Sequence, residues 1–167
     1  MRLIIVEDLL RVLKSINIML KDLPDSIELI MVHCNTWNEP VDFSFEGKGW
    51  YSVKTEDELY DVCEEKLGIC NDDHYLLDIT LFQEKQVNKR FNDYISVKLA
   101  CHIEEKKKDG VKIKFYTDPR GISQNDFARE TVRWGKPIYR PKLDDNNDEE
   151  KVAREIFIQK IEEYCNV

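Results

Sequence analysis

The fold is decided by the first eight residues of the chain, MRLIIVED (residues 1–8). Within them, Leu3–Val6 is an apolar run with β-branched residues, which is typical of a strand buried on both faces of a parallel sheet. Glu7 and Asp8 end this run, so it is too short for a membrane span or for the apolar core of a signal peptide. A buried strand that ends in two acids predicts an α/β sheet with polar groups at its carboxyl edge.

Beyond this strand, the apolar residues alternate between the spacing of helices and the spacing of strands. Residues 9–23 place leucine, valine and isoleucine three or four positions apart, as in an amphipathic helix. Thr55 and Glu58 form a capping box that predicts the start of the next helix. The same reasoning predicts strands over residues 2–6, 27–32, 75–79, 111–116 and 138–141, and helices over residues 9–23, 56–67, 91–108, 124–134 and 148–165.

One segment, residues 35–54, interrupts this alternation. Two stretches of alternating polar and apolar residues, 41–45 and 50–53, flank a turn with two glycines, Glu46–Gly49. This pattern is typical of a β-hairpin, and we expect it as an insertion after the second strand. Because an isolated hairpin is marginally stable in water, its aromatic residues should either cover the sheet edge or contact a partner: Phe43, Phe45, Trp50 and Tyr51.

The predicted order of elements decides the fold class. Strands that alternate with helices pair in parallel through right-handed crossovers, and five of them make a doubly wound, flavodoxin-like sheet. At this size the common strand order is 2-1-3-4-5. We therefore expect a single α/β domain over residues 1–167, with a five-stranded parallel sheet and the hairpin insertion at about residues 35–54.

The charge balance restricts the classes of partner. Among 167 residues, 33 acidic side chains outnumber 25 basic ones, for a net charge of −8. A protein that binds nucleic acid or an anionic membrane needs a basic surface, so we expect neither nucleic acid nor a membrane as a partner. The five cysteines include no C-x-x-C pair, which favours reduced thiols and a cytoplasmic protein.

Polar side chains stand at the predicted carboxyl ends of the strands, where open α/β sheets gather their functional groups. Glu7 and Asp8 end the first strand, and Asp78 lies near the end of the third. These strands are neighbours in the expected order, so their carboxylates should converge. Close carboxylates repel by about 1–4 kcal/mol per pair, and Mg²⁺ is the natural cation to hold them together. Thr117 and Lys142, after the fourth and fifth strands, would then bind a phosphoryl group.

At these positions the chain resembles the receiver domain of two-component response regulators. Residues 1–8 are similar to that family's first strand and acidic pair, and Asp78 falls where the family carries its phospho-accepting aspartate. Thr117 matches its hydroxyl position at the end of the fourth strand. The resemblance spans essentially the whole chain. The family's C-terminal spacing of glycine, aromatic residue and lysine is kept by Gly135, Tyr139 and Lys142.

The resemblance implies a stand-alone signalling module of a phosphorelay, in which a histidine kinase or a phosphotransfer protein donates a phosphoryl group to Asp78. The signal would pass to a downstream protein, and a second copy of the chain, in a homodimer, is a further candidate partner. The resemblance also implies catalytic roles for Asp78, Thr117 and Lys142. It implies a Mg²⁺ ion with the following ligands: Glu7, Asp8, Asp78 and the backbone carbonyl of Thr80.

Several residues depart from the family's pattern. The family usually follows its lysine with proline, whereas Leu143 follows Lys142. Lys136, which is followed by Pro137, is a rival for the same role. Asp118 replaces the small residue that usually follows the hydroxyl position. These departures leave open a second interpretation, a pseudo-receiver that acts as a protein-interaction scaffold without phosphorylation.

A third interpretation is a small Mg²⁺-dependent phosphatase. The triplet Asp78-Ile79-Thr80 is similar to the nucleophile motif of haloacid-dehalogenase-like phosphatases, in which a second acid stands at the position of Thr80. Turnover of a generic phosphate ester would reveal such an enzyme. Phosphorylation and Mg²⁺ affinity distinguish a receiver from a scaffold.

Overall fold

The computed structural model describes residues 1–40, 49–82, 84, 89–107, 110–117, 133–141 and 148–167. Its strands are β1 (Arg2–Glu7), β2 (Glu28–Cys34), β3 (Gly49–Val53), β4 (Asp73–Asp78), β5 (Lys112–Thr117) and β6 (Ile138–Tyr139). Its α-helices are α1 (Leu10–Met19), α2 (Glu56–Asp61), α3 (Ile95–Lys106) and α5 (Asp148–Cys165). A π-helical turn, η1 (Val62–Lys66), extends α2, and a 3-10 turn, η2 (Phe91–Asp93), precedes α3.

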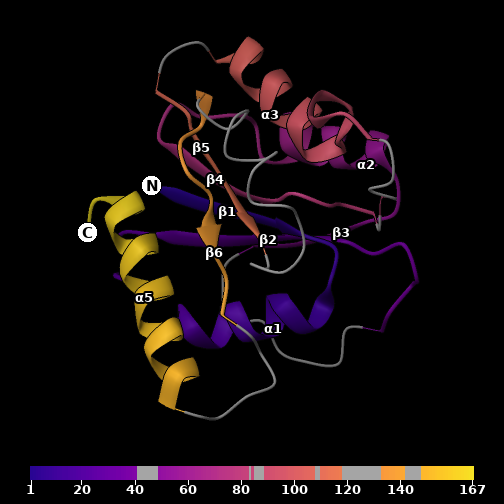
Figure 1. Cartoon of the computed structure of the whole chain (residues 1–167). Coiled ribbons are helices and arrows are strands. Elements are labelled where there is room, and N and C mark those ends of the chain that lie inside the picture. The colour runs from indigo at the N-terminus through magenta and orange to yellow at the C-terminus, as the bar shows by residue number, and fades with distance from the viewer. Residues whose placement is uncertain (41–48, 83, 85–88, 108–109, 118–132, 142–147) are drawn as a thin grey trace.

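The six strands form one parallel sheet in the order β3-β2-β1-β4-β5-β6 (Figure 1). An α/β fold with a parallel sheet is therefore confirmed, but the expected count of five strands is wrong. The expected strands correspond to β1, β2, β4, β5 and β6, and β3 is added outside β2. The order of the whole sheet thus differs from 2-1-3-4-5 by this sixth strand at the edge.

The sixth strand is the second arm of the expected hairpin insertion, and its pairing with β2 was not expected. β3 pairs in parallel with β2, from Gly49 opposite Ile30 to Val53 opposite Cys34. The first arm of the expected hairpin falls in residues 41–48, outside the described residues. The alternation of polar and apolar residues indicated a strand over residues 50–53 but not which strand it pairs with. Pairing depends on which sheet edge lets the strand bury its apolar side chains. As a parallel strand, β3 buries Val53, which is 1% exposed, and pairs the backbone groups along the edge of β2.

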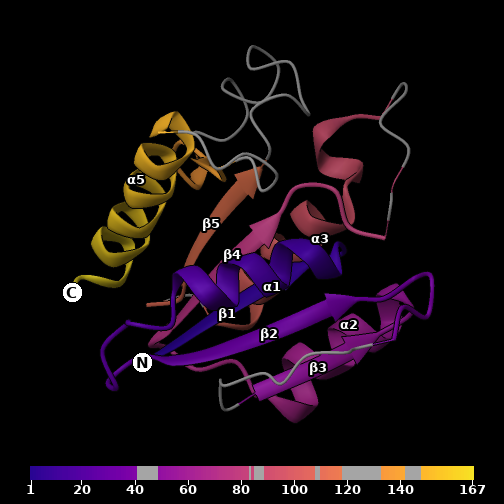
Figure 2. The ribbon, with the colours of Figure 1, turned by 90° about the horizontal axis from the view of Figure 1, so that it is seen from below.

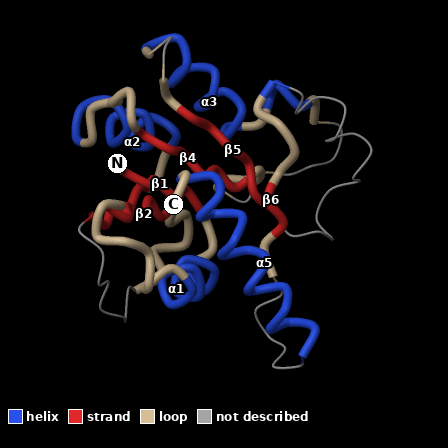
Figure 3. Tube along the Cα trace, turned by 90° about the vertical axis from the view of Figure 1, so that its left-hand side faces the viewer, coloured by secondary structure: helices blue, strands red, loops and turns tan. Residues whose placement is uncertain are grey.

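Helices cover both faces of the sheet, with α1 and α5 on one face and α2 and α3 on the other (Figures 1 and 2). Side chains alternate along each strand. In β1, Leu3 and Ile5 pack in the core beneath α1 and α5, whereas Ile4 and Val6 pack in the core beneath α2 and α3. The view of Figure 3 shows α5 beside β6, the strand at the opposite edge from β3.

Local signals decide several helix ends. Thr55 Oγ1 accepts a hydrogen bond from the Glu58 N–H at 3.2 Å, which confirms the cap of α2, and α5 has the bounds predicted for it. The helix expected from residue 91 is split, because the extended backbone of Tyr94 (ψ 138°) separates η2 from α3. Most of the helix predicted over residues 124–134 lies outside the described residues.

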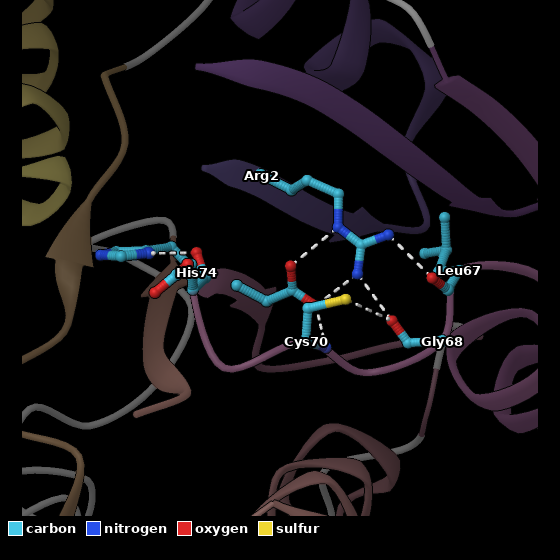
Figure 4. Close-up of polar contacts among 7 residues, drawn as sticks. Arg2, Leu67, Gly68, Cys70 and His74 are labelled. Carbon is cyan, nitrogen blue, oxygen red and sulfur yellow. Dashed lines mark hydrogen bonds and ion pairs between the residues drawn. The ribbon is translucent and has the colours of Figure 1, made fainter. Parts of the chain in front are cut away.

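At the amino edge of the sheet, Arg2 joins three parts of the chain (Figure 4). Its guanidinium donates to the Asp73 carboxylate at 2.7 and 2.8 Å, and to the carbonyl oxygens of Leu67 and Gly68 at 2.7 and 2.6 Å. Asp73 also accepts the Cys70 N–H at 2.8 Å. These bonds tie the starts of β1 and β4 to the segment after η1, so they hold the two central strands in register.

Candidate metal centre

The register of β1 and β4 brings the predicted acidic residues together. The two strands are parallel neighbours, with Val6 opposite Leu77. Glu7 is the last residue of β1 and Asp78 is the last residue of β4, so both carboxylates stand at the carboxyl edge of the sheet. Asp8 follows Glu7 directly. The three acids expected to converge therefore do so at the centre of the sheet.

Carboxylate oxygens of Glu7, Asp8 and Asp78 lie within 4.8 Å of one another. Their exposed fractions are 0%, 8% and 5%, so little solvent screens the three groups. Negative charges at this spacing repel strongly where the dielectric constant is low. Hard divalent cations such as Mg²⁺ prefer oxygen ligands of this kind, so the cluster could hold a divalent cation.

Burial and mutual repulsion raise the pKa of two of these carboxyls. The pKa of Asp78 rises to about 8, first because burial disfavours the charged form and next because Asp8 lies nearby. Burial, followed by the charge of Asp78, raises the pKa of Glu7 well above its ordinary value. A cation bound among these groups would favour their ionised forms, since metal binding displaces protons from its ligands.

Glu7 is held by three hydrogen bonds. Its Oε1 accepts the N–H groups of Asp8 and Leu9, each at 3.0 Å. Its Oε2 accepts the hydroxyl of Tyr116 at 2.6 Å. Because each carboxylate oxygen has two lone pairs, Glu7 keeps one lone pair, at Oε2, for a further partner. Tyr116 was not expected at the site, since an aromatic residue within an apolar strand carries no sequence signal for such a contact.

The turn after β4 orients Asp78. The Thr80 hydroxyl donates to Asp78 Oδ2 over 3.4 Å, and the buried Ser96 hydroxyl donates to the Ile79 carbonyl oxygen at 2.6 Å. A backbone hydrogen bond from Ile79 also favours the charged form of the Asp78 carboxyl. Thr80, whose backbone carbonyl remains a predicted metal ligand, also contacts Asp78 through its side chain.

Glu84 connects the turn after β4 to the start of α3. Its Oε2 accepts the Leu81 N–H over 3.4 Å, and its Oε1 accepts the Ile95 N–H at the start of α3 at 3.0 Å. Lys89 forms an ion pair with the same carboxylate. The Glu84 side chain is only 4% exposed, so this one buried acid connects Leu81 and Lys89 to the start of α3.

Arg140, the residue after β6, supplies positive charge at this edge. Its charge opposes the rise in the pKa of both Glu7 and Asp78. Its backbone N–H donates to the Thr117 carbonyl oxygen at 3.0 Å, and its buried Nε has no hydrogen-bond partner among the described residues. Arg140 was not expected from the sequence. The available signal was Pro141, since a basic residue followed by proline is the pattern of the receiver family.

Of the remaining expected residues, Thr117 and Lys136 lie toward opposite ends of β6. Thr117 is the last residue of β5, is 8% exposed, and lies beside Arg140 at the carboxyl edge. Lys142 lies outside the described residues. Its rival, Lys136, precedes β6, whereas Arg140 follows it, and Lys136 lines a cavity with Lys114 rather than the acidic cluster.

His33 is a buried, uncharged neighbour of the cluster. It lies opposite Glu7 in the register of β2 and β1 and is fully buried. Burial lowers the pKa of its imidazole, so the ring is neutral at pH 7. The His33 ring lies 5.8 Å from the ring of Trp50 on β3, and its Nε2 is 3.8 Å from Glu39 Oε2. That distance is too long for a hydrogen bond.

Comparison of the chain with protein-family models, curated proteins and solved structures finds no match. Within the described ranges, no helix has the combination of length and apolar character that crossing a membrane requires. A fold of this class hosts many activities, so the argument for a function rests on the acidic cluster and its neighbours.

Proposed function

We propose that this chain is a stand-alone receiver-like signalling module, in which Asp78 accepts a phosphoryl group in a Mg²⁺-dependent reaction. The observation that carries the proposal is the cluster of three buried carboxylates, with oxygens within 4.8 Å of one another, at the ends of β1 and β4. A cation there would relieve the repulsion among them. Asp8 and Asp78 would bind it directly, and Glu7 would contribute Oε2 or a water-mediated contact.

The proposed reaction places Asp78 as the nucleophile. One carboxylate oxygen of Asp78 forms a bond to phosphorus, and the bond from phosphorus to the donor breaks, with its electron pair leaving on the donor. Bound Mg²⁺ would neutralise charge on the phosphoryl oxygens. Phosphoryl transfer depends mainly on positioning and charge neutralisation, and the hydrogen bonds around Asp78 and Ile79 support such positioning.

Arg140 and Thr117 complete the proposed site. A planar guanidinium presents several donors that match phosphoryl oxygens, and the unpartnered Nε of Arg140 supports this role. The hydroxyl of Thr117 is at the same edge of the sheet. Arg140 is followed by Pro141, so it takes the role that the resemblance assigns to a lysine. Lys142 stays a candidate for that role as well.

The same proposal includes the partners. A histidine kinase or a phosphotransfer protein would donate the phosphoryl group, because an aspartate can take it directly from a phosphohistidine. A downstream protein, or a second copy of the chain, would recognise the phosphorylated surface. Since the carboxyl edge carries the acceptor, the partner surface should include Thr80 and Leu81, which follow β4.

One observation favours the alternative, a pseudo-receiver that acts as a scaffold. Glu7 already accepts hydrogen bonds from the Asp8 and Leu9 N–H groups and from the Tyr116 hydroxyl. A carboxylate satisfied in this way stabilises the turn after β1 without any metal. If the cluster is a structural network only, the chain would bind its partner in one constitutive state.

Chemical phosphorylation separates the two functions. With Mg²⁺ and acetyl phosphate, we expect a mass increase of one phosphoryl group that is stable in acid and labile in base. Asp78→Asn should abolish the increase, because an amide oxygen is a poor nucleophile and carries no charge. The matched control is Asp72→Asn, which removes an exposed acid six residues earlier in the chain and should label like the wild type.

Two results would decide against this proposal. Labelling that survives in Asp78→Asn at the wild-type level would exclude Asp78 as the acceptor. A folded wild-type protein that never labels, yet still captures a partner, would favour the scaffold. In that case, Mg²⁺ should also leave the unfolding temperature unchanged.

A further inference from the structure

A cavity of about 310 Å³ lies between β5, β6 and α5. Figures 1 and 3 show α5 beside β6 at this edge of the molecule. The cavity is separate from the acidic cluster, because neither the three acids nor Arg140 belongs to its lining. The lining includes the start of β6, whereas Arg140 follows the end of that strand. Its lining consists of Lys114, Lys136, Pro137, Ile138, Lys160, Glu163 and Tyr164.

The charge of the lining is opposite to that of the protein. Lys114, Lys136 and Lys160 bring three ammonium groups to the cavity of a chain whose net charge is −8. None of the three forms an ion pair with another described residue. The lining contains one carboxylate, Glu163, whose Oε1 accepts a hydrogen bond from the Gln159 side chain at 3.1 Å. Three lysines against one carboxylate leave the lining with an excess of positive charge, which focuses a positive potential in the cavity.

The position of the Lys114 side chain depends on β5 and on the backbone of Gly135. It lies in β5 and is half-buried between the buried Ile113 and Phe115. Gly135 has a φ of +75°, a conformation that favours glycine, and a side-chain carbon at this position would lie 3.2 Å from Lys114 Nζ. The absence of a side chain at Gly135 therefore leaves room for the ammonium group beside β6.

The remaining wall of the cavity is apolar and fixed. Pro137 and Ile138 are buried, and the Tyr164 hydroxyl donates to the Tyr75 carbonyl oxygen at 3.0 Å. The ring of Tyr164 also contacts the ring of His74, with centroids 5.1 Å apart. Small-molecule sites combine such an apolar wall with a few polar groups, and their volumes begin at roughly 300 Å³.

We propose that this cavity is a second binding site, for a phosphorylated small molecule. The three lysines would hold the phosphate oxygens through charge-assisted hydrogen bonds, and Pro137, Ile138 and Tyr164 would contact the rest of the ligand. The volume suits a small molecule rather than a protein segment. The site is independent of the proposed phosphorylation, but Ile138 and Arg140 belong to the same short segment, so a ligand here could affect the carboxyl edge.

Calorimetric titration in metal-free buffer at low salt tests the proposal, with ATP and pyrophosphate as probes. Metal-free buffer withholds the Mg²⁺ that the proposed phosphoryl site requires, so Asp78→Asn should leave the binding of both probes unchanged. Lys136→Gln and Lys160→Gln should each weaken ATP binding by about tenfold or more, as expected for one charge-assisted contact. Both lysines are exposed, so neither change should impair folding. Added salt should weaken binding in the wild type.

The matched control is Lys151→Gln, which makes the same charge change on the same helix, α5, at a lysine outside the lining of the cavity. It should bind ATP as the wild type does. Absence of binding for both probes at about 5 mM would overturn the proposal, since that limit corresponds to a negligible affinity. Unchanged affinity in both lysine variants would overturn it too. Adenosine that binds as tightly as ATP would overturn the role of the phosphates.

Discussion

Arg140 donates its backbone N–H to the carbonyl oxygen of Thr117 at 3.0 Å, which continues the ladder between β5 and β6 beyond their last residue pair. This bond holds the basic residue at the carboxyl edge of the sheet. There its charge favours the ionised forms of Glu7 and Asp78, against the burial that raises the pKa of each carboxyl. Backbone pairing of the edge strand β6 thereby holds the cation Arg140 near acids that end the central strands β1 and β4.

Replacement of Arg140 should impair phosphorylation more than it impairs folding. Arg140→Gln removes the charge that would stabilise the phosphoryl oxygens, so we expect the rate of labelling by acetyl phosphate to fall about tenfold or more. Arg140→Lys should recover part of that rate. The control Arg133→Gln removes an exposed arginine paired with Glu104 and should label normally. A normal rate in Arg140→Gln would assign phosphate binding to another cation, such as Lys142.

Mg²⁺ should stabilise the folded protein. Binding to the folded state alone adds about 1.4 kcal/mol of stability when the Mg²⁺ concentration is tenfold above its dissociation constant. Thermal unfolding with and without Mg²⁺ measures this effect, which Asp8→Asn should abolish because the proposed function assigns Asp8 as a direct ligand. Glu65→Gln, at an exposed acid on η1, should keep it. A wild-type unfolding temperature that does not respond to Mg²⁺ would show that the carboxylates hold no such ion.

Asp78 should make the metal-free protein less stable as the pH rises. An aspartate in an unfolded chain has a pKa of about 3.9, whereas burial and Asp8 raise the pKa of Asp78 to about 8 in the folded state. The folded protein thus binds the proton more tightly, and this stabilisation is complete below about pH 4 and lost as the pH rises to about 8. Urea unfolding of Asp78→Asn should show a gain of about 1–3 kcal/mol over the wild type at high pH.

The comparison with Asp78→Asn has an internal control. At pH 4 the wild-type carboxyl is protonated in the folded state, so the two proteins should unfold at similar urea concentrations. Asp72→Asn, at an exposed acid, should follow the wild type at every pH. A difference between wild type and Asp78→Asn that does not vary with pH would contradict the raised pKa.

The pair Arg2 and Asp73 should be essential for stability. The Asp73 side chain is 1% exposed and the Arg2 side chain is 19% exposed, so Asp73→Asn leaves a partly buried guanidinium without its carboxylate. Asp73→Asn should cost about 1–3 kcal/mol of unfolding free energy, measured by urea denaturation. Asp25→Asn, at an exposed acid, is the control. A loss below 1 kcal/mol would show that the bonds of Arg2 to the Leu67 and Gly68 carbonyls suffice without the ion pair.

Trp50 tests whether β3 is structural or an interface. Its half-buried side chain packs against the core beneath α1 and α5, so Trp50→Ala should cost about 1–3 kcal/mol of unfolding free energy. Trp37→Ala, which truncates a tryptophan that is 67% exposed, should cost far less. Denaturation and sedimentation together separate the alternatives. Unchanged stability of Trp50→Ala with altered self-association would favour an interface.

Local sequence signals sufficed for most of the elements. The apolar runs of Leu3–Val6 and Tyr75–Leu77 are strands, and the helix predicted over residues 148–165 has those bounds. The capping box of Thr55 and Glu58 begins α2. Such features depend on contacts between residues a few positions apart, so they can be read along the chain. The convergence of Glu7, Asp8 and Asp78 could also be predicted from the sequence, because neighbouring parallel strands end at the same edge of a sheet.

Other features were decided only by the tertiary structure. Alternation indicated a strand over residues 50–53, but its parallel pairing with β2 depends on which edge its side chains can bury. The hydroxyl of Tyr116 reaches Glu7 across 109 positions of sequence, and the charge of Arg140 reaches it across 133. The sequence alone determined which acidic residues stand at the ends of strands, because a strand end is defined by residues that are neighbours along the chain. Only the folded chain determined which bases and hydroxyls meet them, because electrostatic and hydrogen-bond partners are selected by distance in space, not along the chain.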